Sequence, residues 1–267
     1  MTLSGPLLLI VALLAVLPAL GEDRTNPSSL VGRPTDPIAF RLVEDGLAAE
    51  ARFDSKAALD LFIRADAAQP NSPFILQKIS RQYSDLTVDT PDAAEKHRLC
   101  VEALAYGKRA VDLQPDNAVN VLSLAICYGK LGLYSGTRTK IEYSRLVRQF
   151  AEQALQLNPD YDYAHHVLGR WHYEVASLSG GTRLLMKLVY GGLPPASTAD
   201  AIRHLRRAVE LSPERAPHRV ELGFALLADG QDQEARVAFE QALALPIQEK
   251  YDMEVRRRAA AALATSR

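Results

Sequence analysis

The segment RQFAEQALQLNP (148–159) decides the fold class of this chain. Its small and apolar side chains recur at steps of three and four residues, the spacing of one helix face, and the pattern stops at Pro159. Four other segments end in the same way: AALDLFIRADAAQP (57–70), ALAYGKRAVDLQP (103–115), AIRHLRRAVELSP (201–213) and EARVAFEQALALP (234–246). Repetition of one helix ending along the chain predicts a helical-repeat protein.

A second amphipathic segment precedes each ending and is clearest at 121–132, 165–176 and 219–230. We expect the two segments of a unit to form a helix hairpin, which resembles the tetratricopeptide repeat with its period of ~34 residues. A small residue occupies an equivalent place in the first helix of four units, where it would let the paired helix approach closely: Gly46, Ala125, Gly169 and Gly223.

The units are longer than the ordinary repeat. The intervals between the closing prolines Pro70, Pro115, Pro159 and Pro213 all exceed the period of ~34 residues, the last interval most of all. We therefore expect extra residues between the two helices of each unit. The pattern predicts an all-α fold, a tetratricopeptide-like α-solenoid of about five helix pairs over residues 38–247. Residues 248–267 are expected to form a C-terminal capping helix over the apolar edge of the last pair.

Some stretches are more specific than a generic repeat. They are residues 135–178, residues 188–213 and VEALAYGKRAVDLQP (101–115), together with the insertions at those points. They resemble the regulator of microtubule dynamics family over roughly residues 40–260. The resemblance implies a helical, non-enzymatic protein. It also implies the properties of the animal members, some of which associate with microtubules while others tether organelle membranes and bind phospholipid through the repeat domain.

The N-terminal segment indicates export. Residues 1–21 carry no charged side chain, contain the apolar run Leu7–Leu17, and place small residues at Ala19 and Gly21, as a signal peptidase requires. We therefore expect this segment to be a signal peptide, cleaved near Gly21, and the mature chain to be periplasmic or secreted. An uncleaved membrane anchor is the alternative, because Leu3–Leu20 approaches the roughly 20 residues of a span. For an exported chain, only the scaffold or lipid aspect of the family would carry over.

A flexible linker is expected at residues 22–37, because EDRTNPSSLVGRPTDP is rich in Pro, Ser, Asp and Arg and has no period. The formal net charge of −1 argues against nucleic acid as a partner. Between Lys130 and Arg207, however, the sequence contains eleven basic residues and only six acidic ones. This central basic belt suits an anionic peptide or lipid headgroups, or it is an ordinary solvated face.

A partner-binding groove is predicted on the concave face of the solenoid, where the first helix of each pair lies. Tyr163, His166, Arg170 and Tyr173 form one stripe on such a helix. Equivalent counting from the closing prolines adds Arg81, Ile126, Lys130 and Phe224. This mixture suits a protein or peptide partner with acidic groups or a C-terminal carboxylate, which arginine holds through two hydrogen bonds. Alternatively, these are ordinary surface residues.

The insertion GGTRLLMKLVYGGLPP (180–195) predicts a short helix between two glycine pairs. It combines apolar bulk with two cations, and its candidate lipid or membrane residues are Arg183, Leu184, Leu185, Met186, Lys187, Leu188 and Tyr190. The alternative function is therefore a phospholipid-binding or membrane-tethering module. A structural plug packed on the solenoid is the other interpretation.

Catalytic chemistry is not indicated. His165, His166 and His172 share one helix without a carboxylate at metal-ligand spacing, and nucleophile or phosphate-loop motifs do not occur. We expect no enzyme activity, metal site or cofactor. Cys100 and Cys127 fall in neighbouring units and are either buried thiols or a disulfide pair.

Overall fold

The computed structural model describes residues 32–265, and in this part of the chain 79% of the residues lie in twelve helices and none in a strand. The all-α expectation is thereby confirmed. The helices are α2 (Pro37–Ala51), α3 (Ser55–Ala68), α4 (Pro73–Asp89), α5 (Ala93–Leu113), α6 (Ala118–Leu133), α7 (Thr137–Leu157), α8 (Asp162–Ala176), α9 (Gly180–Tyr190), α10 (Thr198–Leu211), α11 (Ala216–Ala228), α12 (Asp232–Ala244) and α13 (Asp252–Thr265).

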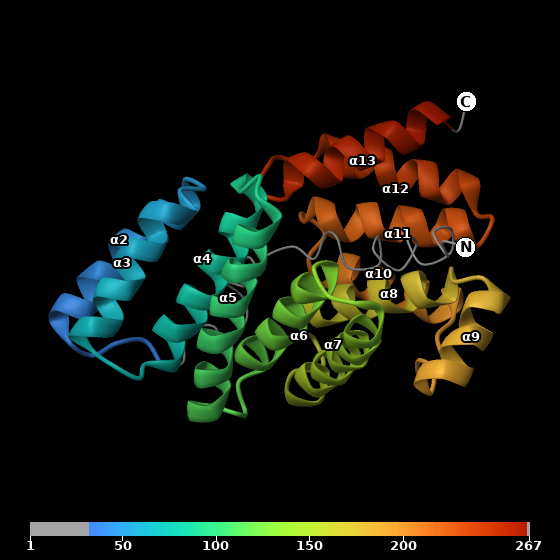
Figure 1. Ribbon diagram of the computed structural model, residues 1–267. Helices are drawn as coiled ribbons and strands as arrows, with labels where there is room; N and C mark the ends of the chain where they lie inside the picture. Colours follow the sequence, from blue (N-terminus) through green and yellow to red (C-terminus); the bar gives the residue numbers. More distant parts are fainter. Residues whose placement is uncertain (1–31, 266–267) are drawn as a thin grey trace.

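Five antiparallel pairs stack in chain order: α2/α3, α4/α5, α6/α7, α8/α10 and α11/α12. Figure 1 shows them following a curved path from the first pair (blue) to the last (orange), and α13 (red) lies against α11 and α12. The protein is therefore an α-solenoid of tetratricopeptide type that ends in a capping helix. Stacking is what buries the apolar face that one pair alone would leave in water.

Close approach within the pairs depends on the glycines of the first helices. A methyl group added at Gly46 or Gly223 would lie 2.6 or 2.5 Å from the ring of Phe62 or Phe239 on the partner helix. At Gly169 it would lie 2.5 Å from Leu205 of α10. These contacts confirm the prediction that a small residue at this place lets the paired helix approach closely.

The extra residues of the second and third units do not separate the two helices of the pair, contrary to expectation. They lengthen the helices instead, so α5 and α7 have 21 residues each. In α7, the buried Ile141, Ser144 and Val147 precede Ala151 and Ala154 at the same spacing, so the added turns bury the same face. Only the fourth unit has a true insertion within the described residues, α9 and the loop that leads to α10.

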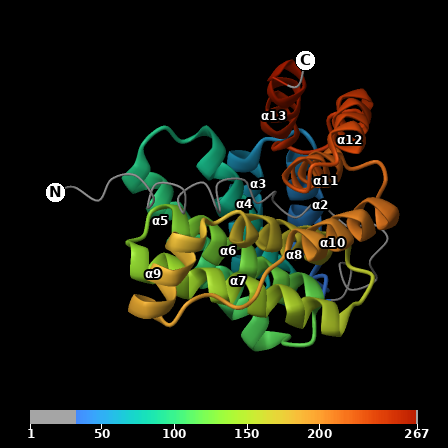
Figure 2. The same cartoon turned by 90° about the vertical axis from the view of Figure 1, so that its right-hand side faces the viewer.

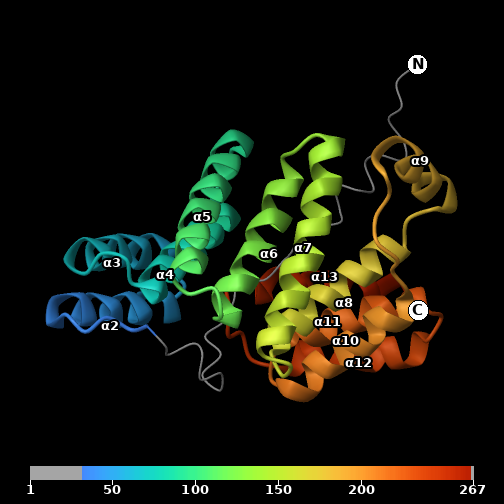
Figure 3. The ribbon, with the colours of Figure 1, turned by 90° about the horizontal axis from the view of Figure 1, so that it is seen from below.

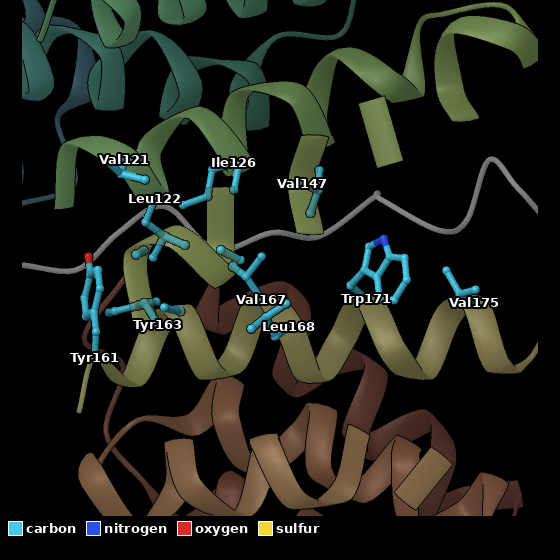
Figure 4. Close-up of a cluster of buried hydrophobic side chains, with 14 of the residues drawn as sticks. Val121, Leu122, Ile126, Val147, Tyr161, Tyr163, Val167, Leu168, Trp171 and Val175 are labelled. Atoms are coloured by element: carbon cyan, nitrogen blue, oxygen red, sulfur yellow. The ribbon is translucent and has the colours of Figure 1, made fainter. Parts of the chain in front are cut away.

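The largest apolar cluster lies where α6, α7 and α8 meet. Figure 4 shows Leu122 and Ile126 of α6 on one side and Val167, Leu168 and Trp171 of α8 on the other. The indole Nε1 of Trp171 donates to the carbonyl and the hydroxyl of Ser144 at 2.9 and 3.0 Å, so the only polar atom of that side chain is satisfied.

The predicted signal peptide (1–21) and residues 22–31 of the predicted linker lie outside the described residues, so export remains a prediction. The rest of the linker packs on the first pairs. Gln69 Oε1 accepts from the backbone N–H of Thr35 and Asp36 at 2.8 and 2.7 Å, and the Ser72 hydroxyl donates to the Gly32 carbonyl at 2.8 Å. Over residues 32–265, no helix has both the length and the apolar character that a bilayer span requires.

Candidate functional site on the inner surface

The inner surface is the face formed by the first helices of the pairs, α2, α4, α6, α8 and α11. Among these, α4 contacts α6, α6 contacts α8 and α8 contacts α11. The connection between α12 and α13, residues 246–251, returns along this face; we call it the linking segment. In Figure 1 the start of α13 lies beside the end of α4. The linking segment therefore runs from α12, in the fifth pair, to α4, in the second.

Glu249 of the linking segment is buried at the centre of the inner surface, 7% exposed. Its Oε1 accepts hydrogen bonds from the Tyr163 hydroxyl and from Arg215 Nη1, the latter at 2.6 Å. Burial raises the pKa of Glu249 to about 7, against the opposing pull of Arg215 and Arg81. Its other oxygen is buried and has no hydrogen-bond partner within residues 32–265.

Lys250 and Tyr251 of the linking segment also contact distant helices. Lys130 Nζ donates to the Ser84 carbonyl at 2.7 Å and to the Tyr251 hydroxyl, and it lies 4.8 Å from the centre of the Tyr251 ring. Lys250 forms an ion pair with Asp89 and lies 3.3 Å from the hydroxyl of Ser55, at the start of α3. The linking segment therefore contacts units far from it in sequence.

A carboxylate network occupies the first half of the inner surface. Glu50 of α2 lies 3.0 Å from Lys78 Nζ and 2.9 Å from Arg81 Nε on α4, and Gln82 donates to it at 3.1 Å. Burial alone would raise the pKa of Glu50, but Arg81 and Lys78 hold this pKa below its ordinary value. Both cations of α4 are thus directed to a carboxylate of this chain.

A second network joins α8 to α11. His218 Nε2 lies 3.0 Å from Asp162 Oδ2, and His218 Nδ1 lies 3.0 Å from His166 Nδ1. The two facing nitrogens can share only one hydrogen, so one ring donates and the other accepts. Burial and the neighbouring His218 lower the pKa of His166 to about 3. His218 and Arg215 lower the pKa of Asp162 to about 2, although burial opposes them.

A third network joins α8, α11 and α13. Glu221, 1% exposed, lies 3.3 Å from Arg170 and 2.6 Å from Arg258. Arg170 also lies 3.4 Å from Glu174. Burial acts against the charge of Glu221, yet Arg170 and Arg258 lower the pKa of Glu221 to about 2. The capping helix is thereby connected to the inner surface through charge as well as through apolar packing.

The residues predicted to line a groove all lie on first helices: Arg81 on α4, Ile126 and Lys130 on α6, Tyr163, His166, Arg170 and Tyr173 on α8, and Phe224 on α11. Five of the eight are buried, and Arg81, Tyr173 and Phe224 are half-buried. Ile126 belongs to the apolar cluster of α6–α8. Their role in binding a partner remains a prediction.

Sequence reasoning missed most of the charged partners of those residues. The structure adds Glu50, Asp162, Arg215, His218, Glu221, Glu249, Tyr251 and Arg258 to the inner surface. A signal for two of them was present, because His218 and Glu221 precede Phe224 at steps of three on α11. The start of the predicted capping helix (248–267) is wrong, because α13 begins only at Asp252 and residues 248–251 belong to the linking segment. Helical spacing therefore gave no signal for the contacts of Glu249 and Tyr251.

The insertion helix α9 stands at the edge of the molecule in Figure 3, and Figure 2 places it on the side opposite α12. Arg145 of α7 holds its C-terminal end by donating to the carbonyls of Tyr190, at 2.6 Å, and Gly192. Met186 is buried, while four large apolar side chains are 46–75% exposed: Leu184, Leu185, Leu188 and Val189. Neither Arg183 nor Lys187 forms an ion pair within residues 32–265.

Cys100 and Cys127 are buried free thiols, so the structure holds no bond between them. Burial raises the pKa of Cys100 to about 11, which leaves it unreactive at neutral pH. In the described part of the chain, the histidines, cysteines and carboxylates form no group of three that could hold a metal ion.

These features define a class of protein: a tetratricopeptide-type helical-repeat scaffold, a fold that is typically non-catalytic and works with protein partners. The tetratricopeptide-repeat protein TTC0263 of Thermus thermophilus has the same fold, with a TM-score of 0.62 and 23% identity over 85% of this chain and 99% of that one.

The family model described as Regulator of microtubule dynamics protein 1-3 matches residues 44–267. The chain belongs to this family. Regulator of microtubule dynamics protein 1 of Mus musculus is 29% identical over 138 residues, 52% of this chain and 45% of the relative. Protein 3 of Xenopus laevis is 26% identical over 194 residues, 72% of this chain and 42% of the relative. The chain thus spans less than half the length of these curated relatives.

Proposed function

We propose that this protein is a non-catalytic scaffold that binds an acidic segment of a protein partner on its inner surface. The observation that carries the proposal is the position of Glu249, an acidic side chain outside the repeat helices that is held there by Arg215 and Tyr163. An arginine and a phenol directed to one carboxylate form a site that suits acidic peptide groups.

Further support comes from the source of the cations. Arg81, Lys130 and Arg215 come from three different units, so cations lie along the length of the inner surface, each of them already engaged by a group of this chain. An extended partner segment with several acidic residues would compete with those groups for the three cations. Helical-repeat scaffolds bind extended segments along stacked first helices in this way.

The test is binding of a labelled, glutamate-rich peptide with a free C-terminal carboxylate, measured by fluorescence polarisation. The comparison is made in a chain that carries Glu249→Ala, so that no carboxylate of its own competes for Arg215. We expect Arg215→Gln to raise the peptide Kd about tenfold in this chain, because a charged hydrogen bond contributes about 1.5–3 kcal/mol. Arg236→Gln is the matched control, since Arg236 lies on α12 and pairs with Glu240 in an exposed site. Equal binding by both variants, or equal binding of the glutamine counterpart of the peptide, would contradict the proposal.

A second candidate function rests on α9. Its exposed leucines lie beside Arg183 and Lys187, and no acidic residue occurs between Glu174 and Asp200. Apolar side chains flanked by cations suit the surface of an anionic lipid bilayer. The phospholipid-binding or tethering alternative would therefore act through this helix and the central basic belt.

The vesicle experiment for this candidate compares Leu188→Asp with Val237→Asp, an exposed apolar position on α12. Cosedimentation with phosphatidylcholine vesicles that contain phosphatidylserine should fall about tenfold or more for Leu188→Asp, since burial of a leucine contributes about 1.5–3 kcal/mol. Val237→Asp should bind like the unaltered protein. Similar loss in both variants, or no vesicle binding by the unaltered protein, would exclude a membrane role for α9.

A further inference from the structure

The linking segment has the contacts of a bound ligand. It lies outside the helices, it leads into α13 with the sequence IQEKYD (247–252), and its Glu249, Lys250 and Tyr251 each reach a different part of the solenoid. Glu249 contacts α8 and the α10–α11 turn, Tyr251 contacts α6, and Lys250 contacts α3 and α4. Ile247 and Gln248, in contrast, are exposed.

The capping function of α13 does not require these contacts. The helix packs on α11 and α12 through Val255 and Ala259, and Arg256 donates to the carbonyls of Leu243 and Leu245. The Glu249 and Tyr251 contacts are therefore additional to the cap.

We infer that the linking segment occupies the partner site of the resting chain as an internal ligand, and that the partner is a segment with an acidic residue two positions before a tyrosine. The inference rests on the proposed function, because it assigns the same inner surface. The recognition elements are Arg215 and Tyr163 for the carboxylate and Lys130 for the phenol. A partner must displace the linking segment in order to bind.

Binding of the linking segment to the inner surface buries the Glu249 carboxyl unfavourably, and this supports replacement of the segment by a partner. One oxygen of Glu249 is buried without a hydrogen bond inside residues 32–265, and burial of this carboxyl outweighs the cations around it. The charged and titratable groups that act on it are Arg215 before α11, Arg81 of α4, Tyr163 of α8 and Asp252 of α13. Asp162 of α8 lies 3.3 Å from the same Arg215. Release lets the Glu249 carboxylate regain water.

The experiment measures binding of two peptides to the full chain: acetyl-IQEKYD-amide, and a control in which the glutamate is glutamine and the tyrosine is phenylalanine. The released variant carries Glu249→Ala and Tyr251→Ala, and Gln248→Ala is the matched control within the same segment. We expect the released variant to bind the first peptide about tenfold more tightly than the unaltered chain. Its linking segment lacks the charged hydrogen bonds of Glu249 and Tyr251 and therefore no longer competes with the peptide. Gln248→Ala and the control peptide should show no gain.

Hydrogen exchange on the unaltered chain provides a measurement that does not depend on how the variant folds. An excess of the first peptide should accelerate exchange of the amides of residues 247–251 and leave those of α12 unchanged. Unchanged exchange with the peptide bound would overturn the internal-ligand proposal. Equal affinity of the unaltered and released chains for the glutamate-rich peptide would also overturn it, while leaving the proposed function intact. If neither folded chain binds any acidic peptide, the proposed function itself fails.

Discussion

Glu221→Ala is expected to lower the free energy of unfolding by about 3–5 kcal/mol, because it leaves buried cations without their shared carboxylate. Glu221 lies within 3.3 Å of both Arg170, whose side chain is 3% exposed, and Arg258. Arg170 would lose its 3.3 Å contact and Arg258 its 2.6 Å contact, while both guanidinium groups would stay largely out of water. The measurement is urea denaturation followed by circular dichroism.

The control for this substitution is Glu234→Ala. Glu234 makes an ion pair of comparable length with Arg206, 2.8 Å, but its side chain is 61% exposed. A pair in water contributes about 0–1 kcal/mol, so the free energy of unfolding should hardly change. Similar losses for the two variants would mean that burial of the Glu221 network has no special effect on stability.

The second large effect is expected for Gly169→Ala, which should lower the free energy of unfolding by about 2 kcal/mol through overpacking. The new methyl group would lie 2.5 Å from Leu205 Cγ and 3.1 Å from the backbone of Ala201 and Leu205, so α10 would have to move. Overpacking of this kind typically costs about 1–3 kcal/mol, and it outweighs the better helix propensity of alanine, about 1 kcal/mol, when backbone has to shift. Thermal or urea denaturation measures the change.

Gly136→Ala is the matched control, since a methyl group added at Gly136, before α7, has no neighbour within 4 Å and the residue has φ −69°. The double variant Gly169→Ala with Leu205→Ala adds a further check. It should recover little stability, because the two backbone contacts at 3.1 Å persist and a cavity replaces the leucine. Full recovery would show that only the leucine side chain, and not the helix backbone, restricts residue 169.

The sequence predicted the repeat architecture because its signals are local. The endings at Ala65, Ala154 and Ala208 repeat one apolar period, and Gly169 and Gly223 mark where a partner helix has to come close. The same period placed the predicted groove residues on the first helices. The period did not show where the extra residues of the second and third units lie. A longer helix and a longer loop increase the spacing between two closing prolines equally, so the spacing cannot distinguish them.

The neighbours of those residues could not be predicted from spacing. A stripe such as Tyr163, His166 and Arg170 shows which side chains share a face, but not whether water or another part of the chain covers it. Here a carboxylate 86 residues away reaches Tyr163, and a phenol 121 residues away reaches Lys130. Both belong to the connection before α13, which the spacing assigns to the capping helix and the structure does not.

The sequence by itself determined that the chain forms helix pairs, where the second helix of each pair ends, and which face of each first helix points inward, because these depend on interactions within a few residues. Only the tertiary structure decided that the inner surface is a buried charge network and that α9 keeps its leucines exposed. Those outcomes depend on how the small rotations between successive pairs accumulate, since that sum sets which distant segments meet and which remain in water.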